Sequence, residues 1–450
     1  MRVLLVSINR LRYPYPVYPL GLNHVAAALT PRHEVRIVDL CPGAPGDGTL
    51  EAAVRGYEAD VVGVSIRNVD NTDATAARGF TVDARQAVES IRSCTRAPIV
   101  LGGAGYALFP VELLEATGAD HGFIGDGAVS GPLFEALASG RSPAGLPGVV
   151  TAGDSLPQPA RARGPSCPAP ADLNPSLPWY LSHGGMLNLQ TQRGCPFKCI
   201  YCTYPGLEGS LTRPVREGVG VVARRLQDAG ARFISVADSV FNTTPDHALA
   251  VGDAFRDAGV SVPWSAFLAP TRPPESFFAR LAGAGLSHVE FGTESLSDPM
   301  LARIRKSFRR EDVERAHAAA RAAGLHVAHF LLLGGPGETS ETVEETLSRA
   351  DRLEGAAWFV FCGMRIYPGT TLHETAVREG QLSEGNSLLN PTYYRPLGIS
   401  LEEIERRVRH HTATRPGWVM GDGSERAGNV IQALHARGRT GPLWELLVDA

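Results

Sequence analysis

Short apolar runs alternate with amphipathic segments through the first 150 residues. Buried strands are predicted at residues 3–8, 34–38, 61–66, 99–101 and 121–124. Helical periodicity is found between them, at residues 20–29, 77–91, 111–116 and 132–138. Short apolar strands separated by helices predict a parallel, doubly wound sheet. Ligands of such sheets bind outside the carboxyl ends of the strands.

The same alternation resumes after residue 185. Strands are predicted at residues 186–191, 233–237, 264–268, 288–291, 326–333 and 358–361. Helical segments such as 311–323 and 341–353 separate them. Six such units predict an open, partial (β/α)6 barrel of the TIM type, since a closed barrel has eight. The tail, 376–450, is polar with helical segments at 401–410 and 428–438, and we expect it to cap the barrel.

Prolines are concentrated between the two halves. Residues 151–185 contain Pro157, Pro159, Pro165, Pro168, Pro170, Pro175 and Pro178. Such a stretch predicts a linker without regular elements. The predicted organisation is therefore a doubly wound, Rossmann-like domain at 1–150, a linker at 151–185, a partial barrel at 186–375 and a small helical cap at 376–450.

The composition fits a folded, soluble protein of more than one domain, with 450 residues, 44% hydrophobic and 20% charged. The net charge of −4 and the lack of a dense basic run give no reason to expect a nucleic-acid partner. We expect the Arg-rich turn at 305–310 to be a solvated helix end. No apolar run is long enough to cross a bilayer, and no signal-peptide cleavage site follows the first strand. Four of the seven cysteines are scattered, which predicts a reducing, cytoplasmic location.

The other three cysteines are grouped. Cys195, Cys199 and Cys202 are separated by three and two residues. Three thiolates on one loop can hold three irons of a [4Fe-4S] cluster and leave the fourth iron open, whereas most clusters take four cysteines. The alternative is an incomplete zinc knuckle, because zinc takes four Cys or His ligands. No His lies within the loop, and His183 is set apart by Gly-Gly.

This loop resembles the cluster loop of the radical S-adenosylmethionine (SAM) enzymes, including the aromatic residue before the last Cys. Three strand ends downstream resemble the same family: residues 291–295 (Phe-Gly-Thr-Glu-Ser), 331–338 (Leu-Leu-Leu-Gly-Gly-Pro-Gly-Glu) and 365–370 (Arg-Ile-Tyr-Pro-Gly-Thr). The resemblance implies that the three cysteines ligate the cluster. It also implies SAM contacts from Tyr201, Glu294, Gly334 and Gly335.

Each downstream feature also has an ordinary interpretation. Glu294 can be a strand-end acid paired with an Arg. The glycines can form a tight turn, with Glu338 placed favourably near a helix N-terminus. The aromatic residues Tyr367, Tyr393 and Tyr394 can line a pocket at the barrel mouth or simply pack under the cap.

The first 150 residues resemble the cobalamin-binding domain that precedes many radical SAM barrels. The resemblance is carried by residues 16–22, 62–68, 102–105 and 125–127. It implies cobalamin contacts from Ser65, Arg67, Asn68, Gly102, Gly103, Gly125 and Gly127. The Asp-x-His-x-x-Gly motif of better-known cobalamin domains is absent, so Arg67 or Asn68 is expected at the lower face in place of a His. A nucleotide-binding Rossmann domain is the rival, but no Gly-x-Gly-x-x-Gly follows the first strand.

As a whole the chain resembles the class B cobalamin-dependent radical SAM methyltransferases. The resemblance implies that one SAM methylates cob(I)alamin and that a second yields a 5′-deoxyadenosyl radical, which removes a substrate hydrogen. Methylcobalamin then delivers the methyl group to an unactivated carbon. It also implies an external electron donor of flavodoxin or ferredoxin type. We favour a small-molecule substrate, free or on a carrier protein, from natural-product or antibiotic biosynthesis, such as a heteroaromatic pyrrole. The sequence does not identify a catalytic acid or base.

Several other functions remain open. The same cofactors can serve a cyclase, a ring-contracting enzyme or a lipid-modifying enzyme without net methylation. A polar variant would methylate a nucleophilic aromatic carbon without deoxyadenosine. A methylthiotransferase would need three more grouped cysteines and a basic appendage, and a non-catalytic corrinoid carrier would not need the cysteine loop.

Overall fold

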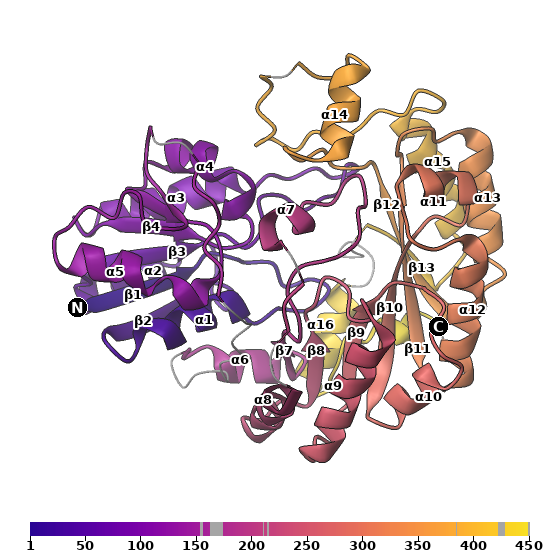
Figure 1. Ribbon diagram of the computed structural model, residues 1–450, viewed down its shortest axis with the longest axis horizontal. Coiled ribbons are helices and arrows are strands. Elements are labelled where there is room, and N and C mark those ends of the chain that lie inside the picture. The colour runs from indigo at the N-terminus through magenta and orange to yellow at the C-terminus, as the bar shows by residue number, and fades with distance from the viewer. Residues whose placement is uncertain are drawn as a thin grey trace. The chain divides into compact units, whose positions relative to one another are not determined.

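The computed structural model describes residues 1–153, 156–162, 174–209, 211–213, 216–383, 385–421 and 428–448 (Figure 1). The chain divides into two compact units. Unit 1 comprises Met1–Arg12, Pro16–Asn71 and Arg78–Tyr180. Unit 2 comprises Tyr13–Tyr15, Thr72–Ala77 and Leu181–Ala450. None of the described helices is both long enough and apolar enough to cross a bilayer.

Unit 1 is built on a six-stranded sheet in the order β2-β1-β3-β4-β5-β6. Its strands are β1 (Arg2–Ser7), β2 (Glu34–Asp39), β3 (Val61–Ser65), β4 (Ile99–Gly102), β5 (His121–Phe123) and β6 (Val149–Val150). The first five are parallel, which confirms the predicted doubly wound class, whereas β6 pairs antiparallel with β5. The chain order reverses between β1 and β3, which is where such sheets bind ligands.

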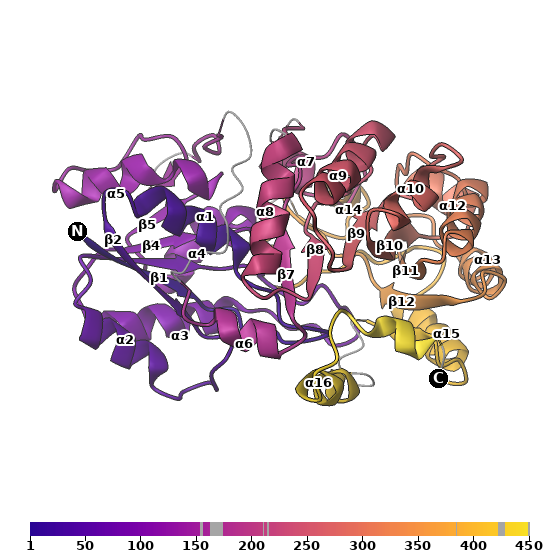
Figure 2. The ribbon, with the colours of Figure 1, turned by 90° about the horizontal axis from the view of Figure 1, so that it is seen from below.

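Helices cover both faces of this sheet. They are α1 (Leu20–Leu29), α2 (Thr49–Tyr57), α3 (Thr81–Arg92), α4 (Pro110–Thr117) and α5 (Gly131–Ala138), with short 3-10 turns at Tyr106–Leu108 and Gly127–Val129. In Figure 2, α1 and α5 lie on one face, and α2 and α3 on the other. A buried core that includes Leu5, Leu22 and Phe134 joins the first pair to the sheet. The sequence analysis did not predict α2, whose buried residues are only Leu50, Val54 and Tyr57.

The described part of the predicted linker contains a helix. Helix α6 (Leu177–Ser182) lies within it, so the expectation of no regular structure was wrong for these residues. Pro178 is compatible with this helix because it occupies the first turn, where the missing N–H would have no partner anyway. Residues 154–155 and 163–173 of the linker lie outside the described residues.

Unit 2 is built on seven parallel strands in the order β13-β12-β11-β10-β9-β8-β7. They are β7 (Met186–Leu189), β8 (Phe233–Val236), β9 (Trp264–Leu268), β10 (Leu286–Glu294), β11 (His326–Leu333), β12 (Ala356–Cys362) and β13 (Trp418–Met420). The first six in chain order confirm the predicted partial barrel. The seventh comes from the tail expected to be a helical cap, and its three residues are too few to show a strand period.

The helices of unit 2 are α7 (Tyr204–Glu208), α8 (Arg216–Asp228), α9 (Pro245–Asp257), α10 (Phe277–Ala282), α11 (Asp298–Arg303), α12 (Arg310–Ala322), α13 (Ser340–Ala350), α14 (Thr371–Arg378), α15 (Leu401–Thr412) and α16 (Gly428–Ala436). Figure 2 shows α8, α9, α10, α12 and α13 as an arc around one side of the strands. The opposite side of the sheet is the barrel interior. Trp444, in the 3-10 turn Trp444–Leu447, packs there against Phe359 and Val419.

Candidate functional site

A buried carboxylate orients the start of the cysteine loop. Asp238 follows β8, beside the end of β7, and its Oδ1 accepts hydrogen bonds from the backbone N–H of Thr191 at 2.7 Å and of Gln192 at 3.1 Å. The Thr191 hydroxyl donates to Asp238 Oδ2 at 2.5 Å. Burial raises the pKa of Asp238 to about 6. Because the bonded form is the carboxylate, Asp238 fixes the loop in its ionised state.

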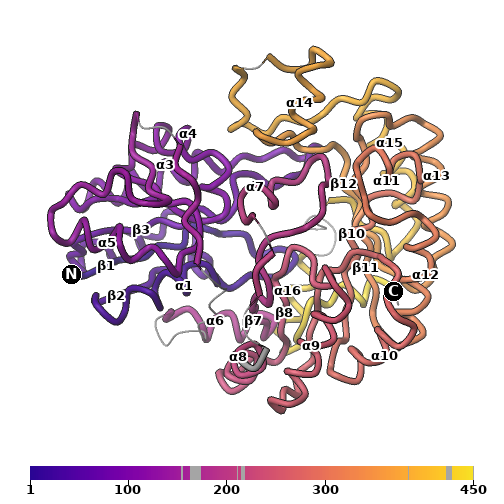
Figure 3. The backbone as a smooth tube through the Cα atoms, in the orientation of Figure 1, coloured from indigo at the N-terminus to yellow at the C-terminus, as the bar shows by residue number. Residues whose placement is uncertain are grey.

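The rest of the loop is held mainly by backbone hydrogen bonds. Figure 3 shows it running from β7 to α7 as an irregular segment. The Ile200 N–H donates to the Ile304 carbonyl at 3.3 Å, and the Leu372 N–H donates to the Ile200 carbonyl at 2.9 Å. Within the loop, the Cys202 N–H donates to the Cys199 carbonyl at 3.3 Å. The segment after α11 and the first turn of α14 therefore hold the middle of the loop.

The three predicted cluster ligands lie together. Cys195, Cys199 and Cys202 are each half-buried. Burial raises the pKa of the Cys199 thiol, and it raises that of Cys202 to about 11. The charge of Cys195 adds to both increases. Three thiolates are the donors that iron–sulfur clusters take, so the residues present fit the predicted group. Among the described residues, no group of three or more His, Cys, Asp or Glu side chains has the arrangement of a metal site.

Beside the loop, three polar side chains form a closed hydrogen-bonded group. Tyr201 Oη donates to Glu294 Oε1 at 2.9 Å, and Lys306 Nζ forms an ion pair with the same oxygen at 2.9 Å. Lys306 Nζ also donates to Tyr201 Oη at 2.9 Å. The side chains of Lys306 and Glu294 are only 9% and 12% exposed. The predicted SAM contacts Tyr201 and Glu294 are thus brought together, and a lysine joins them.

The backbone is unusual at both ends of this ion pair. Glu294 has φ of 61°, and Arg305, next to Lys306, has φ of 58°. The pairing of β10 with β11 shifts register between Gly292 and Glu294. Left-handed backbone at a residue other than glycine costs energy and is concentrated at functional sites. Left-handed backbone thus occurs at Glu294 itself and at Arg305, which directly precedes Lys306.

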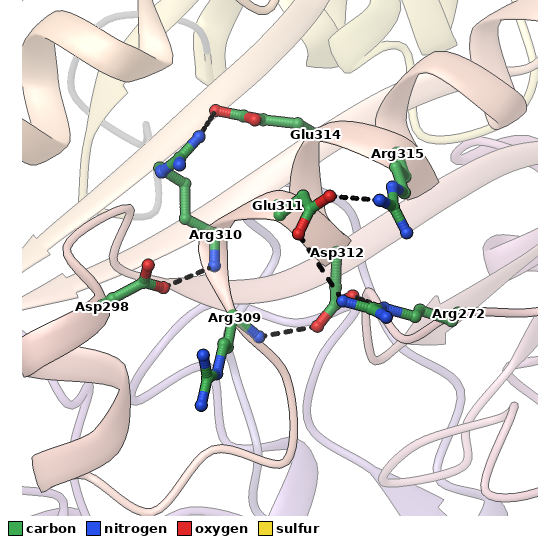
Figure 4. A network of polar contacts seen from close by, with 8 residues as sticks. All are labelled: Arg272, Asp298, Arg309, Arg310, Glu311, Asp312, Glu314 and Arg315. Atoms are coloured by element: carbon green, nitrogen blue, oxygen red, sulfur yellow. Dashed lines mark hydrogen bonds and ion pairs between the residues drawn. The ribbon is translucent and has the colours of Figure 1, made fainter.

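A polar network anchors the segment that carries Lys306 (Figure 4). The Arg309 N–H donates to Asp312 Oδ2 at 2.9 Å, and the Arg310 N–H donates to Asp298 Oδ1 at 2.8 Å. The Arg272 guanidinium pairs with the other oxygen of Asp312. These bonds tie the start of α12 to α11 and to the segment after β9. They fix one end of the turn that places Lys306 beside Glu294.

Lys306 corrects one prediction from the sequence. The turn at 305–310 was expected to be a solvated helix end, and this is wrong for Lys306, which is buried in an ion pair. The signal was its spacing: Ile304 and Phe308, two residues to either side, are 1% and 6% exposed. Ile304, Lys306 and Phe308 are more buried than Arg305 and Ser307 between them, so Lys306 lies on the buried side of the turn.

The predicted glycine turn after β11 is closed by a buried acid. Gly334 has φ of 96°, and a Cβ there would lie 2.8 Å from Leu401 Cδ2. The Gly334 N–H donates to Glu338 Oε2 at 3.1 Å, and Thr342 donates to Glu338 Oε1 at 2.5 Å. Burial raises the pKa of Glu338. The ordinary interpretation of Glu338, an acid at the start of a helix, therefore holds, and its carboxylate also closes the turn at Gly334 and Gly335.

The aromatic residues after β12 have different surroundings. The buried Arg365 donates to the carbonyls of Ile366 and Leu388 at 2.6 Å each and lies 4.8 Å from the centre of the Tyr367 ring. Tyr394 is buried, and its hydroxyl donates to Glu379 Oε2 at 2.5 Å. Tyr394 is therefore a packing residue. Tyr367 and Tyr393 are half-buried.

Aromatic side chains line the barrel interior. The rings of Phe267 and Phe330 lie 5.4 Å apart, and Phe330 stacks on Phe359 at 4.9 Å. Phe267 and Phe330 are only half-buried although they lie on central strands. Their strands alternate inward and outward residues, which made them indistinguishable from ordinary core positions in the sequence. Glu290, on the same inner side, accepts a hydrogen bond from Trp444 Nε1 at 3.3 Å, and burial raises its pKa.

In unit 1, predicted cobalamin contacts gather at the carboxyl ends of β3 and β4. A Cβ on Gly103, whose φ is 103°, would lie 2.5 Å from the Ile66 carbonyl oxygen. The turn that begins with Gly102 therefore lies directly against the segment after Ser65. Within that segment Arg67 is exposed and Asn68 is half-buried.

The last two predicted cobalamin contacts have packing roles. A Cβ on Gly125 would lie 2.1 Å from the Ala160 carbonyl oxygen, so this glycine lets the 156–162 segment pass. A Cβ on Gly127 would lie 2.6 Å from Val25 Cγ2 of α1. Close packing therefore explains both glycines without a ligand.

Comparison with known families agrees with the two halves of the chain. Residues 189–350 match the model of the Radical SAM superfamily. Residues 6–132 match the model of the B12 binding domain. These matches confirm both resemblances drawn from the sequence. They confirm a [4Fe-4S] cluster, SAM and cobalamin as the cofactors.

Similar proteins share this arrangement. An uncharacterized methyltransferase of Pyrococcus horikoshii is 26% identical over 81% of this chain and 79% of its own length. Tryptophan 2-C-methyltransferase of Streptomyces laurentii is 27% identical over 81% of this chain and 73% of its own length. The solved structure of the radical SAM methyltransferase TsrM of Kitasatospora setae superposes with a TM-score of 0.87. It is 22% identical and the match covers 99% of this chain and 98% of that one. At that identity the likeness concerns the fold.

Proposed function

We propose that the chain, a cobalamin-dependent radical SAM methyltransferase, methylates a carbon atom of a small aromatic or heteroaromatic molecule. The observation that carries the acceptor class is the aromatic lining of the barrel. Phe267 and Phe330 keep part of their ring surface uncovered on strands whose other side is fully packed. Half-buried rings of this kind stack on planar substrates. The tryptophan 2-C-methyltransferase relative acts on such a molecule.

We assign the cluster to Cys195, Cys199 and Cys202, and the SAM contacts to Tyr201, Glu294 and the Gly334–Gly335 turn. When bound, these groups and cobalamin supply the activated methyl group and the one-electron chemistry. The protein orients and encloses them. Asp238 holds the start of the cysteine loop, Lys306 holds Glu294 and Tyr201, and Glu338 holds the glycine turn.

We assign the cobalamin contacts to the carboxyl ends of β3 and β4, through Ser65, Arg67, Asn68, Gly102 and Gly103. The close approach of the two turns supports this grouping, because it makes one continuous backbone surface beside the switch point, which lies between β1 and β3. Gly125 and Gly127 then contribute by packing.

The test is methyl transfer to defined acceptors. The full chain is reconstituted anaerobically with iron, sulfide and cobalamin, and incubated with trideuteromethyl-SAM and a panel of indoles and pyrroles. We expect a carbon-bound trideuteromethyl group on at least one acceptor. Cys199→Ala, which removes one cluster ligand, should form no product. A product that is isomerised or ring-contracted without label would support the cyclase or ring-contraction function instead.

The same assay separates two routes of transfer. One 5′-deoxyadenosine per methyl group would indicate hydrogen removal from the acceptor, which also needs an external flavodoxin- or ferredoxin-type donor. Methylation without 5′-deoxyadenosine would indicate direct transfer to a nucleophilic ring carbon. A place in natural-product biosynthesis follows if the methylated acceptor is a specialised metabolite.

A further inference from the structure

The ion pair of Lys306 and Glu294 lies beside the cysteine loop, because both residues bond Tyr201. Burial raises the pKa of the Cys199 thiol, the positive charge of Lys306 acts to lower it, and the negative charge of Glu294 acts to raise it. Lys306 likewise acts to lower the pKa of the Cys202 thiol. Lys306 Nζ donates to the hydroxyl of Tyr201, which lies between Cys199 and Cys202 in the loop. The ammonium is therefore held against the segment that carries these two cysteines.

The ammonium is also fixed in place. Lys306 Nζ is bonded to both Glu294 Oε1 and Tyr201 Oη at 2.9 Å. It lies 5.4 Å from the centre of the Tyr201 ring and 5.8 Å from that of Phe308. The side chain of Lys306 is only 9% exposed, and the segment that follows it is anchored by the hydrogen bond from the Arg309 N–H to Asp312. A lysine on the surface would instead sample many rotamers in water.

A fixed charge of this kind acts on the reduction of a cluster. Reduction adds one electron to the iron–sulfur cage, and a nearby positive charge stabilises the reduced form. The effect is large where water is excluded, because the local dielectric is low. Charge and hydrogen bonding around the sulfurs are among the factors that set cluster potentials.

We propose that Lys306 is a positioning residue that raises the reduction potential of the cluster held by Cys195, Cys199 and Cys202, and that Glu294 partly offsets this effect. The inference rests on the cluster ligation proposed above. It adds a role that neither the cysteine motif nor the SAM contacts require. The chemistry involved is the one-electron couple of the cluster, with the electron supplied by a chemical reductant in the test.

The test is a redox titration of the reconstituted full chain, followed by electron paramagnetic resonance in the absence of SAM. Lys306→Met removes the positive charge and should shift the midpoint potential to a more negative value. Glu294→Gln leaves the lysine unneutralised and should shift the potential to a more positive value. Lys306→Arg keeps the charge and should remain near the wild-type value. A purely structural role would not produce shifts of opposite sign.

Lys198→Met is the matched control. Lys198 precedes Cys199 in the same loop but is exposed, so solvent and salt screen its charge. We expect its loss to move the potential much less than the loss of Lys306. If Lys306→Met fails to retain iron, the potentials of Glu294→Gln and Lys306→Arg still show whether the charge of Lys306 raises the midpoint potential of the cluster. Equal potentials in the wild type and Glu294→Gln, or shifts of the same sign in Glu294→Gln and Lys306→Met, would overturn the inference.

These outcomes are distinct from failure of the proposed function. A wild-type chain that takes up no cluster would refute the ligation itself and the inference with it. A chain with a normal cluster, unchanged potentials in the variants and intact methyl transfer would refute only the role of Lys306.

Discussion

At the scale of single residues, the site depends on charged groups that the motifs do not contain. The three cysteines and Glu294 could be predicted from the sequence, because their spacing and strand-end positions resemble a known family. Asp238 and Lys306 were not predicted, because Asp238 is a single charged residue after its strand and Lys306 lies among the arginines of the 305–310 turn, without a motif that marks either residue. Their roles come from burial and from which strand ends are neighbours, and only the folded chain shows these.

Asp238→Asn should loosen the start of the cysteine loop. The amide keeps one oxygen that can accept from the backbone N–H groups of Thr191 and Gln192, but it loses the charge and presents an N–H₂ where the Thr191 hydroxyl donates in the wild type. Hydrogen bonds to a charged group contribute about 1.5–3 kcal/mol each, so we expect a loss on the order of 3 kcal/mol at the loop. The measurement is iron and acid-labile sulfide per chain after reconstitution, which should fall clearly below the wild type.

Asp246→Asn is the control for this substitution, because Asp246 carries the same charge but is exposed in the first turn of α9. It should retain wild-type iron content. Full cluster occupancy in Asp238→Asn would show that the loop does not need the buried carboxylate.

At the scale of elements, a chain of hydrogen bonds joins β10, β11 and α12 behind Glu294. The Thr293 hydroxyl lies 2.7 Å from His329 Nδ1, and His329 Nε2 lies 3.1 Å from His317 Nδ1. His317 Nε2 lies 3.1 Å from the Glu354 carbonyl, which can only accept. One proton arrangement satisfies every bond, with both histidines neutral and Thr293 donating. This series of hydrogen bonds therefore holds the end of β10, which carries Glu294.

Because both histidines of this hydrogen-bond series are neutral, we predict that the free energy of unfolding decreases in acid. Burial lowers the pKa of His317 to about 4 and that of His329 well below its ordinary value. The unfolded chain takes up both protons near pH 6.5, so the stabilisation is complete above that pH and is lost as the pH falls from 6.5 towards 4. Between pH 7.5 and 5.5 the loss is about 1.4 kcal/mol per histidine.

The measurement is the thermal unfolding midpoint of the full chain at these two pH values. The double variant His317→Gln/His329→Gln should show a smaller decrease between them than the wild type. An equal decrease in both proteins would contradict neutral histidines at these positions.

A second prediction at this scale concerns the turn after β4. Gly103→Ala places a methyl group against the Ile66 carbonyl, so the turn must move away from the segment after β3. We expect weaker cobalamin binding, measured by the absorbance of retained cobalamin, with unchanged cluster content. Gly140→Ala is the control, because Gly140 also has a positive φ, of 65°, but has open space around it. Gly140→Ala should lower the free energy of unfolding only by the backbone strain of a left-handed alanine, about 1–2 kcal/mol. Equal cobalamin retention in both variants would argue against a ligand at this turn.

The sequence predicted elements well where the hydrophobic pattern was long. Helix α1 and strands β9 and β11 have the predicted bounds, because each shows a continuous apolar run or stripe. Strand β13 and helix α6 were missed because neither extends over enough residues to show a period. Pro178 also argued against α6, although a first-turn proline is compatible with a helix.

At the scale of the whole molecule, the sequence predicted both halves and their cofactors, and the family matches confirm them. The predicted boundaries follow chain order, whereas unit 2 also takes in residues 13–15 and 72–77 from the first half. Both stretches lie in loops that follow strands of unit 1, after β1 and after β3. A hydrophobic pattern indicates whether a residue is buried, but not the unit to which the residue belongs. The assignment of residues 13–15 and 72–77 to unit 2 could therefore not be predicted from the sequence.

The central claim is that one chain uses a cluster and cobalamin together to methylate a carbon atom. The most direct measurement is mass spectrometry of the product formed from trideuteromethyl-SAM by protein reconstituted with both cofactors, with the cluster alone and with cobalamin alone. We predict a carbon-bound trideuteromethyl group only when both are present. Labelled product from protein that lacks cobalamin, or unlabelled product from protein that holds both, would contradict the claim.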